Sequence, residues 1–328
     1  MVLSYITSPY SYSQVLYIIA EITFPIHLLG GYCILFKTPL AMKSVKWSLF
    51  NLHFWASLFD LLLSFFEQPF ICMPVLAGFP MGVMKWLNVE TGVMVYIGIT
   101  VNYLVPVSTV SMFENRFFVL FAEDTHWRYI RYLLLIFNYT IAIFSGMVTC
   151  LEIPDQQYAR AIVFAKNSEI IQFDLPESPM FIISVYNPWI TYRLLIYLAL
   201  FVVELFVFTI LIRMNMKKAM TGFRSTISQK TLKMHKNSIK AMNLQVAIPM
   251  LVICVPCLSS IIVPVFLSDH QGFINFTNIV VSSHGALSAL LMIYLQTSYR
   301  AEVVRIVGCC RKLRIGEGVQ VFHISSTS

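Results

Sequence analysis

Seven apolar runs follow one another along this chain, and each is long enough to cross a lipid bilayer. A helix rises about 1.5 Å per residue and the hydrocarbon core is about 30 Å thick, so about 20 apolar residues suffice for one crossing. The sequence therefore predicts an all-α membrane protein, a seven-transmembrane helix bundle. The expected spans are residues 15–36, 47–71, 89–121, 129–151, 188–212, 244–267 and 274–296.

The basic residues predict the orientation of the bundle, because cytoplasmic loops retain Lys and Arg. No Lys or Arg precedes Lys37, and basic residues then gather in every second gap between the spans. With the N-terminus outside and the C-terminus cytoplasmic, 19 of the 23 basic residues lie on the inner side. Six or eight spans would separate the basic tail from the basic third loop, so we expect seven.

Composition supports a single membrane domain. Hydrophobic residues make up 58% of the chain and charged residues 12%, against about 45–50% and about 25% in soluble domains. We expect one transmembrane domain over residues 1–310, whose first run stays as a signal anchor, and a short cytoplasmic tail over 311–328. The net charge of +7 follows from loops near anionic lipid and predicts membrane lipids, not nucleic acid, as partners.

Signatures of catalysis are absent from the sequence. It contains no Gly-rich phosphate loop, no HExxH and no GxSxG motif. Cys254 and Cys257 have CxxC spacing but lie inside the sixth span, where we expect no redox or metal site. We therefore expect no enzyme activity, no cofactor and no metal.

A polar cluster, 113–117 (FENRF), lies near the inner end of the third span. Charges at membrane depth are costly unless they are paired or close to the interface. One interpretation is that Glu114 and Arg116 are interfacial, with Arg116 reaching lipid phosphate. The other is an activation switch made of Glu114, Asn115 and Arg116, because seven-helix receptors carry an acidic-x-Arg-type lock here. The place in the third of seven helices favours the switch.

Apart from Glu114, the acidic residues well inside the spans are Glu21, Asp60 and Glu204. We expect each to face the bundle interior, because facing lipid would cost several kcal/mol. Asp60 could bind an ion, or it could hydrogen-bond polar residues of helix 7 in a structural role. The helix-7 candidates are Ser283, His284 and Ser288, and the acidic or histidine side chains that could touch a ligand are Glu21, His27, Glu67 and Glu204.

The sixth span and the loop before it suggest moving parts. Pro249, Pro256 and Pro264 each remove a helical hydrogen bond, so helix 6 could pivot as a hinge or carry static kinks only. In the third inner loop, 213–243, lysines recur at helical spacing. They could dock a cytoplasmic partner, or they could only mark the inner side and contact lipid. These lysines are Lys230, Lys233, Lys236 and Lys240.

The outer connection 153–187 could fold as a lid over the bundle or form an ordinary loop. It contains no Cys, so it cannot form a disulfide to the third helix. Cys72 and Cys150 could form a bridge, or both could be buried free thiols.

The sequons at Asn138 and Asn275 lie within the bilayer or too near it to predict glycosylation. Cys309 and Cys310 follow the last span in a basic stretch, which fits either palmitoylation or two free thiols.

Several segments together resemble the nematode serpentine receptor class H chemoreceptors, a seven-helix receptor family. They are 37–47 (KTPLAMKSVKW), 51–55 (NLHFW), 77–82 (AGFPMG), 113–117 (FENRF) and 245–249 (QVAIP). The likeness extends over nearly the whole chain. The family often ends its seventh span with Pro-Tyr-Arg, and here Ser298 replaces that proline before Tyr299 and Arg300, which weakens the expected break at the end of helix 7.

The resemblance implies chemosensory signalling in sensory neurons, through a small-molecule ligand outside and a heterotrimeric G protein inside. Under this hypothesis the receptor lies in the plasma membrane, in the cilia of sensory neurons. A transporter or channel would need a continuous polar file, broken Gly-rich helices or internal repeats, of which only scattered acids are present. A structural relative that has lost signalling is a further alternative.

Overall fold

The computed structural model describes residues 2–73, 75–185, 188–222, 271–306 and 308. Within these ranges, six helices are long and apolar enough to cross a membrane. They are Pro9–Lys37, Met42–Phe66, Thr91–Ala122, Trp127–Leu151, Tyr192–Lys218 and Gln271–Leu295, and each overlaps one expected span. The expected sixth span lies outside the described residues, together with Lys230, Lys233, Lys236, Lys240, Pro249, Pro256, Pro264, Cys254, Cys257, Cys309 and Cys310.

The first long helix begins at one proline and ends two residues before another. After the short α1 (Val2–Tyr5), α2 (Pro9–Lys37) starts with proline in its first turn, where the missing amide costs no hydrogen bond. Thr38 follows in an extended conformation with φ −65° and ψ 124°, because the ring of Pro39 disfavours helical backbone angles for the residue before it. A 3₁₀ turn, η1 (Leu40–Val45), then leads into α3 (Lys46–Leu61).

The second helix ends earlier than the apolar run that predicted it. A π-helical segment, η2 (Leu62–Phe66), continues α3, and the chain then turns sharply at Gln68, whose φ is 45°. Pro69 opens strand β1 (Pro69–Cys72). The last residues of the expected span 47–71 therefore belong to a sheet, since Pro69 cannot continue the helix.

Three antiparallel strands form a small sheet in the order β1-β2-β3. Strand β2 (Leu76–Pro80) pairs with β1 from Pro69↔Pro80 to Cys72↔Ala77 and with β3 (Phe181–Ser184) at Ala77↔Ile182. The described part of the outer connection, residues 153–185, is thus folded, with α7 (Gln156–Lys166), η4 (Ser168–Phe173) and β3. Its apolar side chains join those of β1, β2 and α2 in one buried cluster.

The other helices run along the bundle. They are α5 (Thr91–Phe117) with the π-helical η3 (Phe118–Ala122), α6 (Trp127–Leu151), α8 (Pro188–Gly222), α10 (Gln271–Val281) and α11 (His284–Leu295). The short α4 (Val83–Trp86) follows β2, and residues 297–306 are helical beyond α11. The expected span 274–296 is therefore two helices, separated at Ser282 and Ser283.

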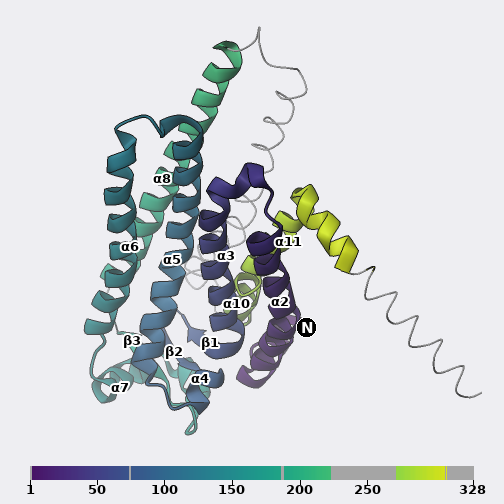
Figure 1. The fold of residues 1–328 in the computed structure, drawn as a ribbon. Coiled ribbons are helices and arrows are strands. Elements are labelled where there is room, and N and C mark those ends of the chain that lie inside the picture. Colours follow the sequence, from purple (N-terminus) through teal and green to yellow (C-terminus); the bar gives the residue numbers. More distant parts are fainter. Residues whose placement is uncertain (1, 74, 186–187, 223–270, 307, 309–328) are drawn as a thin grey trace, which may run out of the picture.

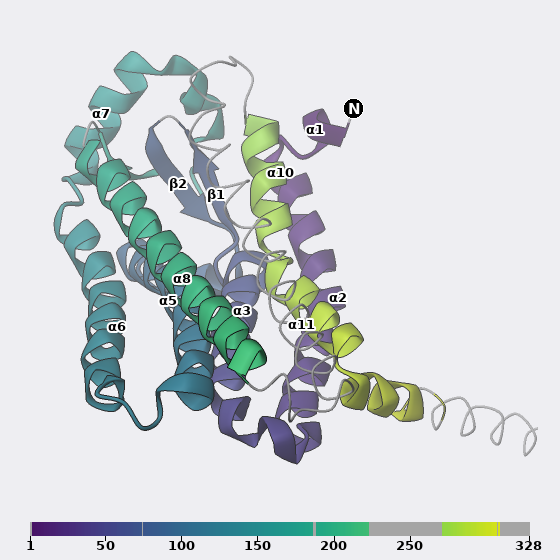
Figure 2. The ribbon, with the colours of Figure 1, turned by 90° about the horizontal axis from the view of Figure 1, so that it is seen from above.

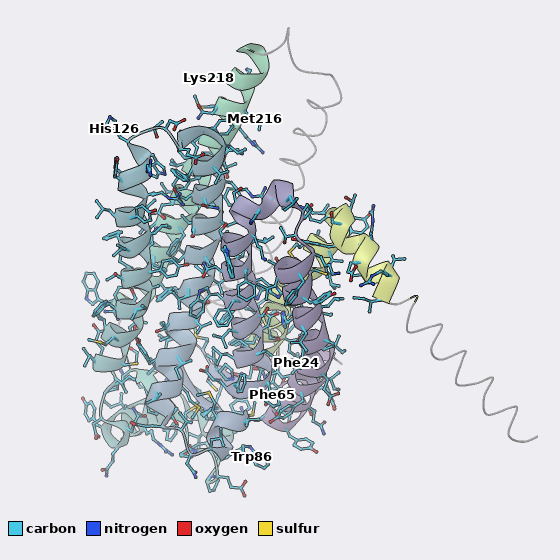
Figure 3. The ribbon with its side chains drawn as sticks, in the orientation of Figure 1. Phe24, Phe65, Trp86, His126, Met216 and Lys218 are labelled. Atoms are coloured by element: carbon cyan, nitrogen blue, oxygen red, sulfur yellow. The ribbon has the colours of Figure 1, made fainter. Side chains whose placement is uncertain are left out.

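The sheet and the short helices α4 and α7 lie at one end of the bundle only. Figure 1 shows β1, β2, β3, α4 and α7 together at one end, which we call the sheet end. Figure 3 places His126 and Lys218 at the opposite end from Trp86, and we call that opposite end the basic end. The sheet end joins two connections that are far apart in sequence, because β2 pairs with strands from both.

Helix α5 lies at the centre of the described bundle, in contact with α3, α6 and α8. Its buried residues form a continuous core with those of the neighbouring helices, including Tyr103, Val107 and Phe113. On the other side, α11 contacts both α2 and α3, and Figure 2 shows α10 and α11 beside α2, away from α6. The polar side chains described next lie in these helix contacts.

Candidate functional site

At the basic end, the Glu114 carboxylate is held by the next helix along the chain. Glu114 is fully buried on α5, and Arg131 of α6 donates to it from one guanidinium nitrogen at 2.9 Å. The indole Nε1 of Trp127 donates to the other oxygen at 2.8 Å. The Arg131 guanidinium also lies over the Phe118 ring, 3.9 Å from its centroid. Glu114 is therefore a paired buried charge that fastens α5 to α6.

Asn115 extends this contact to a third segment. Its side-chain oxygen accepts a hydrogen bond from Arg131 at 3.0 Å. Its Nδ2 donates to Ser48 Oγ at 3.1 Å and to the Ser44 carbonyl at 3.2 Å. The 113–117 cluster thus ties α5 to α6 on one side and to η1 and α3 on the other.

Arg116, the third residue of the expected switch, points to a different neighbour. Its Nε is buried and finds no hydrogen-bond acceptor among the described residues, and the Tyr299 hydroxyl lies close enough to interact electrostatically with its guanidinium. Tyr299 is itself fully buried, 2.7 Å from Thr38 Oγ1, which in turn donates to the Ile34 carbonyl at 2.6 Å. Tyr299 therefore links the segment after α11 to the end of α2.

Asp60 lies fully buried on α3, and donors from the start of α11 surround it. Its Oδ1 accepts from the Gly285 amide at 3.1 Å and its Oδ2 from the Ala286 amide at 2.9 Å. His284 Nδ1 lies 2.6 Å from Oδ1. The carboxylate thus occupies the N-terminus of a helix, where free amides and the helix dipole favour negative charge.

A second histidine approaches Asp60 from α2. His27 Nε2 lies 3.3 Å from Asp60 Oδ2, and His27 Nδ1 lies 2.9 Å from Ser57 Oγ. His53 contacts the His27 carbonyl through its Nε2 at 2.9 Å. We call Asp60, His27 and His284 the carboxylate–histidine cluster. It joins α2, α3 and α11 at one point.

Glu204 pairs with an amide rather than with a cation. On α8 it accepts a hydrogen bond from Asn138 Nδ2 of α6 at 2.7 Å. Asn138 is almost fully buried. The pair crosses from the fourth expected span to the fifth, as an interhelical hydrogen bond within the bilayer would.

The expectation that Glu21 faces the bundle interior was wrong. Glu21 is exposed, on the same side of α2 as Ile18 and Ile22, whose side chains are also exposed. The buried stripe of α2 recurs at spacings of three and four and includes Ala20 and Thr23. Glu21 follows Ala20 by one position, which turns it about 100° away from the interior.

Two aromatic hydroxyls lie in the contact between α5 and α8. The rings of Tyr103 and Tyr197 are 4.2 Å apart between centroids, and Phe201 packs against Tyr197 at the same distance. The Tyr197 hydroxyl is buried and has no hydrogen-bond partner among the described residues. This is a packed aromatic contact with a buried hydroxyl that has no partner in the described part of the chain.

The remaining sequence candidates have plain positions. Cys72 and Cys150 are free thiols, and burial raises the pKa of Cys72 to about 12. Both sequon amides are buried; Asn275 donates to the Ile6 carbonyl at 2.8 Å. In the part of the chain that the structure describes, no group of three acidic, His or Cys side chains is arranged to hold a metal ion.

Sequence reasoning did not find the partners of the 113–117 cluster. Arg131 was counted only as an inner-loop charge, and Trp127 was not singled out, although both lie one helical turn apart at the start of α6. A basic residue facing the preceding helix across a short turn is the available signal. Tyr299 was named for its place in the family motif, whereas its contact with Thr38 has no local signature.

The fold resembles that of a solved seven-helix receptor. The crystal structure of squid rhodopsin matches with a TM-score of 0.59, covering 92% of this chain and 87% of that chain at 12% sequence identity. At this identity the likeness establishes the fold alone, a seven-transmembrane bundle.

Sequence comparison identifies the family. Serpentine receptor class H-72 of Caenorhabditis elegans is 43% identical over 99 residues, which cover 30% of this chain and 29% of that receptor. The match therefore spans less than a third of the relative. The family described as serpentine type 7TM GPCR chemoreceptor Srh matches residues 7–309. With its membrane-spanning helices, the chain is a multi-pass membrane protein that belongs to the Srh family of serpentine seven-transmembrane chemoreceptors.

Proposed function

We propose that this chain is a chemosensory G-protein-coupled receptor, which binds a small molecule from outside and activates a cytoplasmic Gα subunit. Membership of the Srh family and the rhodopsin-like fold support this proposal. The sheet end faces outside and the basic end faces the cytoplasm, as the distribution of Lys and Arg favours. The receptor lies in the plasma membrane, in the cilia of sensory neurons.

The observation that carries the coupling proposal is the division of labour within the 113–117 cluster. Glu114 and Asn115 are engaged by Arg131 of α6, while the neighbouring Arg116 has a buried Nε without an acceptor among the described residues. The Arg116 Nε is thus a buried donor that a rearranged neighbour could engage. In the proposed mechanism, the third span (α5) and the sixth span rearrange, and Arg116 then contacts the Gα subunit.

The ligand enters among the third, fifth, sixth and seventh spans, beneath the folded segment 153–185. The contact of Tyr103, Tyr197 and Phe201 supports an apolar ligand with one hydrogen-bonding group, because the buried Tyr197 hydroxyl has no partner in the described part of the chain. The ligand shifts a two-state bundle by binding one arrangement more tightly. Helix 6 pivots at Pro249, Pro256 and Pro264, and Lys230, Lys233, Lys236 and Lys240 contact the Gα subunit.

Coupling is tested with an Arg116→Ala variant in cells that carry a Gα reporter, challenged with a panel of volatile and lipid-like molecules. We expect responses in the unsubstituted receptor and none in Arg116→Ala, with equal surface expression. Arg128→Ala, which removes an exposed arginine of α6, is the matched control and should respond normally. Ligand-dependent coupling that survives in Arg116→Ala would exclude the switch, and ligand-evoked current in cells without G proteins would favour a channel.

Localisation is tested with a fluorescent fusion at the C-terminus, expressed from the native promoter. Enrichment in the ciliated endings of a few sensory neurons supports chemoreception and identifies the cells in which to screen ligands. Uniform expression in gut or muscle membranes would contradict an environmental sensor. Loss of palmitate incorporation in a variant lacking Cys309 and Cys310 would support palmitoylation of the tail.

A further inference from the structure

The carboxylate–histidine cluster contains more titratable groups than a structural hydrogen bond requires. One fully buried carboxylate, Asp60, lies between His284 at 2.6 Å and His27 at 3.3 Å. Both backbone amides at the start of α11 already satisfy this carboxylate. A buried Asp with two amide donors needs no histidine to be hydrogen-bonded, so the two imidazoles call for a second explanation.

The geometry defines where protons can reside. His284 Nδ1 contacts two acceptors, Asp60 Oδ1 and the Val281 carbonyl at 2.9 Å, so Nδ1 carries a hydrogen. His284 Nε2 is buried without a hydrogen-bond partner among the described residues. His27 Nε2 lies 3.3 Å from Asp60 Oδ2, within ion-pair distance but without forming a hydrogen bond, and its Nδ1 lies 2.9 Å from the Ser57 hydroxyl, which can donate or accept. His284 can therefore be neutral or charged while its Nδ1 keeps its contact with Asp60, and His27 lies within ion-pair distance of the same carboxylate.

The net charge of the cluster depends on that choice. With both imidazoles neutral, the cluster carries one buried negative charge, and adding one proton to a ring nitrogen makes it neutral overall. Burial in a medium of low dielectric favours the neutral total. In the described residues, the titratable groups that contact the cluster are His27 on α2, His53 and Asp60 on α3, and His284 on α11. Helix α5 packs on α3 without contributing a further partner to Asp60 within ion-pair distance.

We propose that this cluster is a proton-binding site that regulates the bundle. A proton held among Asp60, His284 and His27 fastens α11, the second half of the seventh span, to α2 and α3. The seventh span is broken at Ser282 and Ser283, and α11 begins directly on the carboxylate. Uptake of the proton strengthens the attachment of α11 to α3 and α2, and its loss loosens that attachment. The consequence for signalling rests on the proposed receptor function, whereas proton binding itself does not.

The histidine chemistry suggests substitutions that remove the charge and keep the shape. In His284→Asn, the side-chain amide takes the place of Nδ1 and still donates to Asp60, but cannot accept a proton. In His27→Gln, the amide takes the place of Nε2 in the same way. His126→Gln is the matched control, because His126 is exposed at the basic end (Figure 3) and lies away from the cluster.

The test is the thermal midpoint of the purified full chain in detergent at pH 5.5 and pH 8, which needs neither ligand nor Gα. We expect the midpoint to fall between the two pH values by about 3 °C more in the unsubstituted chain and in His126→Gln than in His284→Asn or His27→Gln. Titration of groups outside the cluster, including Glu67, cancels in this comparison. Equal pH dependence in all four proteins would overturn the proposal and leave the receptor function untouched.

Hydrogen exchange of the unsubstituted chain gives a second reading if either variant does not fold. The Gly285 and Ala286 amides bond to Asp60, so their protection reports the attachment of α11. After correction for intrinsic exchange, protection of this segment should fall as the pH rises from 5.5 to 8, within the range in which histidine titrates. Protection that does not change across this interval would contradict a proton-linked attachment.

Discussion

Glu114 and Arg131 lie on neighbouring helices, 2.9 Å apart between a carboxylate oxygen and a guanidinium nitrogen, with the carboxylate fully buried. The pair closes the basic end of the α5–α6 contact, where Trp127 completes the hydrogen bonds of the same carboxylate. Removing either residue should destabilise the fold, because the other would remain as a buried charge without a partner.

Substituting Arg131 by Ala should destabilise the bundle by about 3–5 kcal/mol, because Glu114 would remain buried without its cation. Glu114→Gln should cost less, since the amide oxygen can still accept from Trp127. Denaturation of the purified variants in detergent measures both effects. Arg128→Ala, an exposed arginine three positions earlier, is the control; equal stability of the two arginine variants would show that the pair contributes little.

Glu302 anchors the helical segment 297–306 to the end of α2. Lys37 lies 3.1 Å from its carboxylate, Tyr32 donates at 3.2 Å, and Arg305 donates through two nitrogens. Glu302→Gln should increase amide exchange over 297–306, measured by mass spectrometry. Arg300→Gln, an exposed neighbour, should leave exchange unchanged.

The pH range of this anchor follows from the direction of its shift. Hydrogen bonds and charges from Arg305 and Lys37 lower the pKa of Glu302 to about 2, below its ordinary value of 4.5. A depressed pKa stabilises the attached state above the ordinary value, and that stabilisation is lost as the pH falls through about 2. Corrected exchange over 297–306 should therefore be the same at pH 7 and pH 5, and a rise at pH 5 would contradict the anchor.

Glu67 should make the sheet end less stable at high pH. It is buried just beyond the second membrane helix, and burial raises its pKa to about 8 from 4.5. A raised carboxyl pKa means that stability is full below 4.5 and declines as the pH rises toward 8, by about 1.4 kcal/mol per pH unit. Glu67→Gln should therefore raise the thermal midpoint at pH 8 and leave it unchanged at pH 4.5.

The control for this prediction is Glu177→Gln, which changes an exposed carboxyl at the same end. Its midpoint should follow that of the unsubstituted chain at both pH values. If Glu67→Gln gave no gain at pH 8, the carboxyl would have a partner or water that lowers its pKa.

The outer edge of β3 is closed by the side chain of Gln156. Its Oε1 accepts from the Ile182 amide at 2.8 Å, and its Nε2 donates to the Ile182 carbonyl at 3.0 Å. Gln156→Ala should cost about 1–3 kcal/mol locally through the loss of two hydrogen bonds, seen as faster exchange at Ile182. Gln157→Ala, on the exposed side of α7, should not change that rate.

Hydropathy predicted the membrane helices because a bilayer demands about 20 apolar residues per crossing. Each of the six membrane-length helices in the described residues overlaps an expected span. The sheet could not be predicted in the same way. Residues 69–72 (PFIC) continue the apolar run of the second span, and a short apolar run does not distinguish a strand from a helix. Gln68 and Pro69 were the local signals for the boundary.

The candidate site shows the same division between local and long-range information. Glu114 and Arg116 stood out because charges are rare in a span, but residues two positions apart do not face each other on a helix. The partner, Arg131, is 17 residues away, and only the packing of α5 against α6 brings it close. His284 was named beside Asp60, whereas the approach of His27 from α2 needed the structure.

The length of α8 sets where another protein could meet the receptor. Its 35 residues correspond to about 52 Å of helix, against a hydrocarbon thickness of about 30 Å. Figure 1 shows its last turns extending past η1 and η3 at the basic end. The helix exceeds the hydrocarbon thickness by about 20 Å, so we expect its last turns to leave the hydrocarbon on that side and to offer a helical surface to a binding protein.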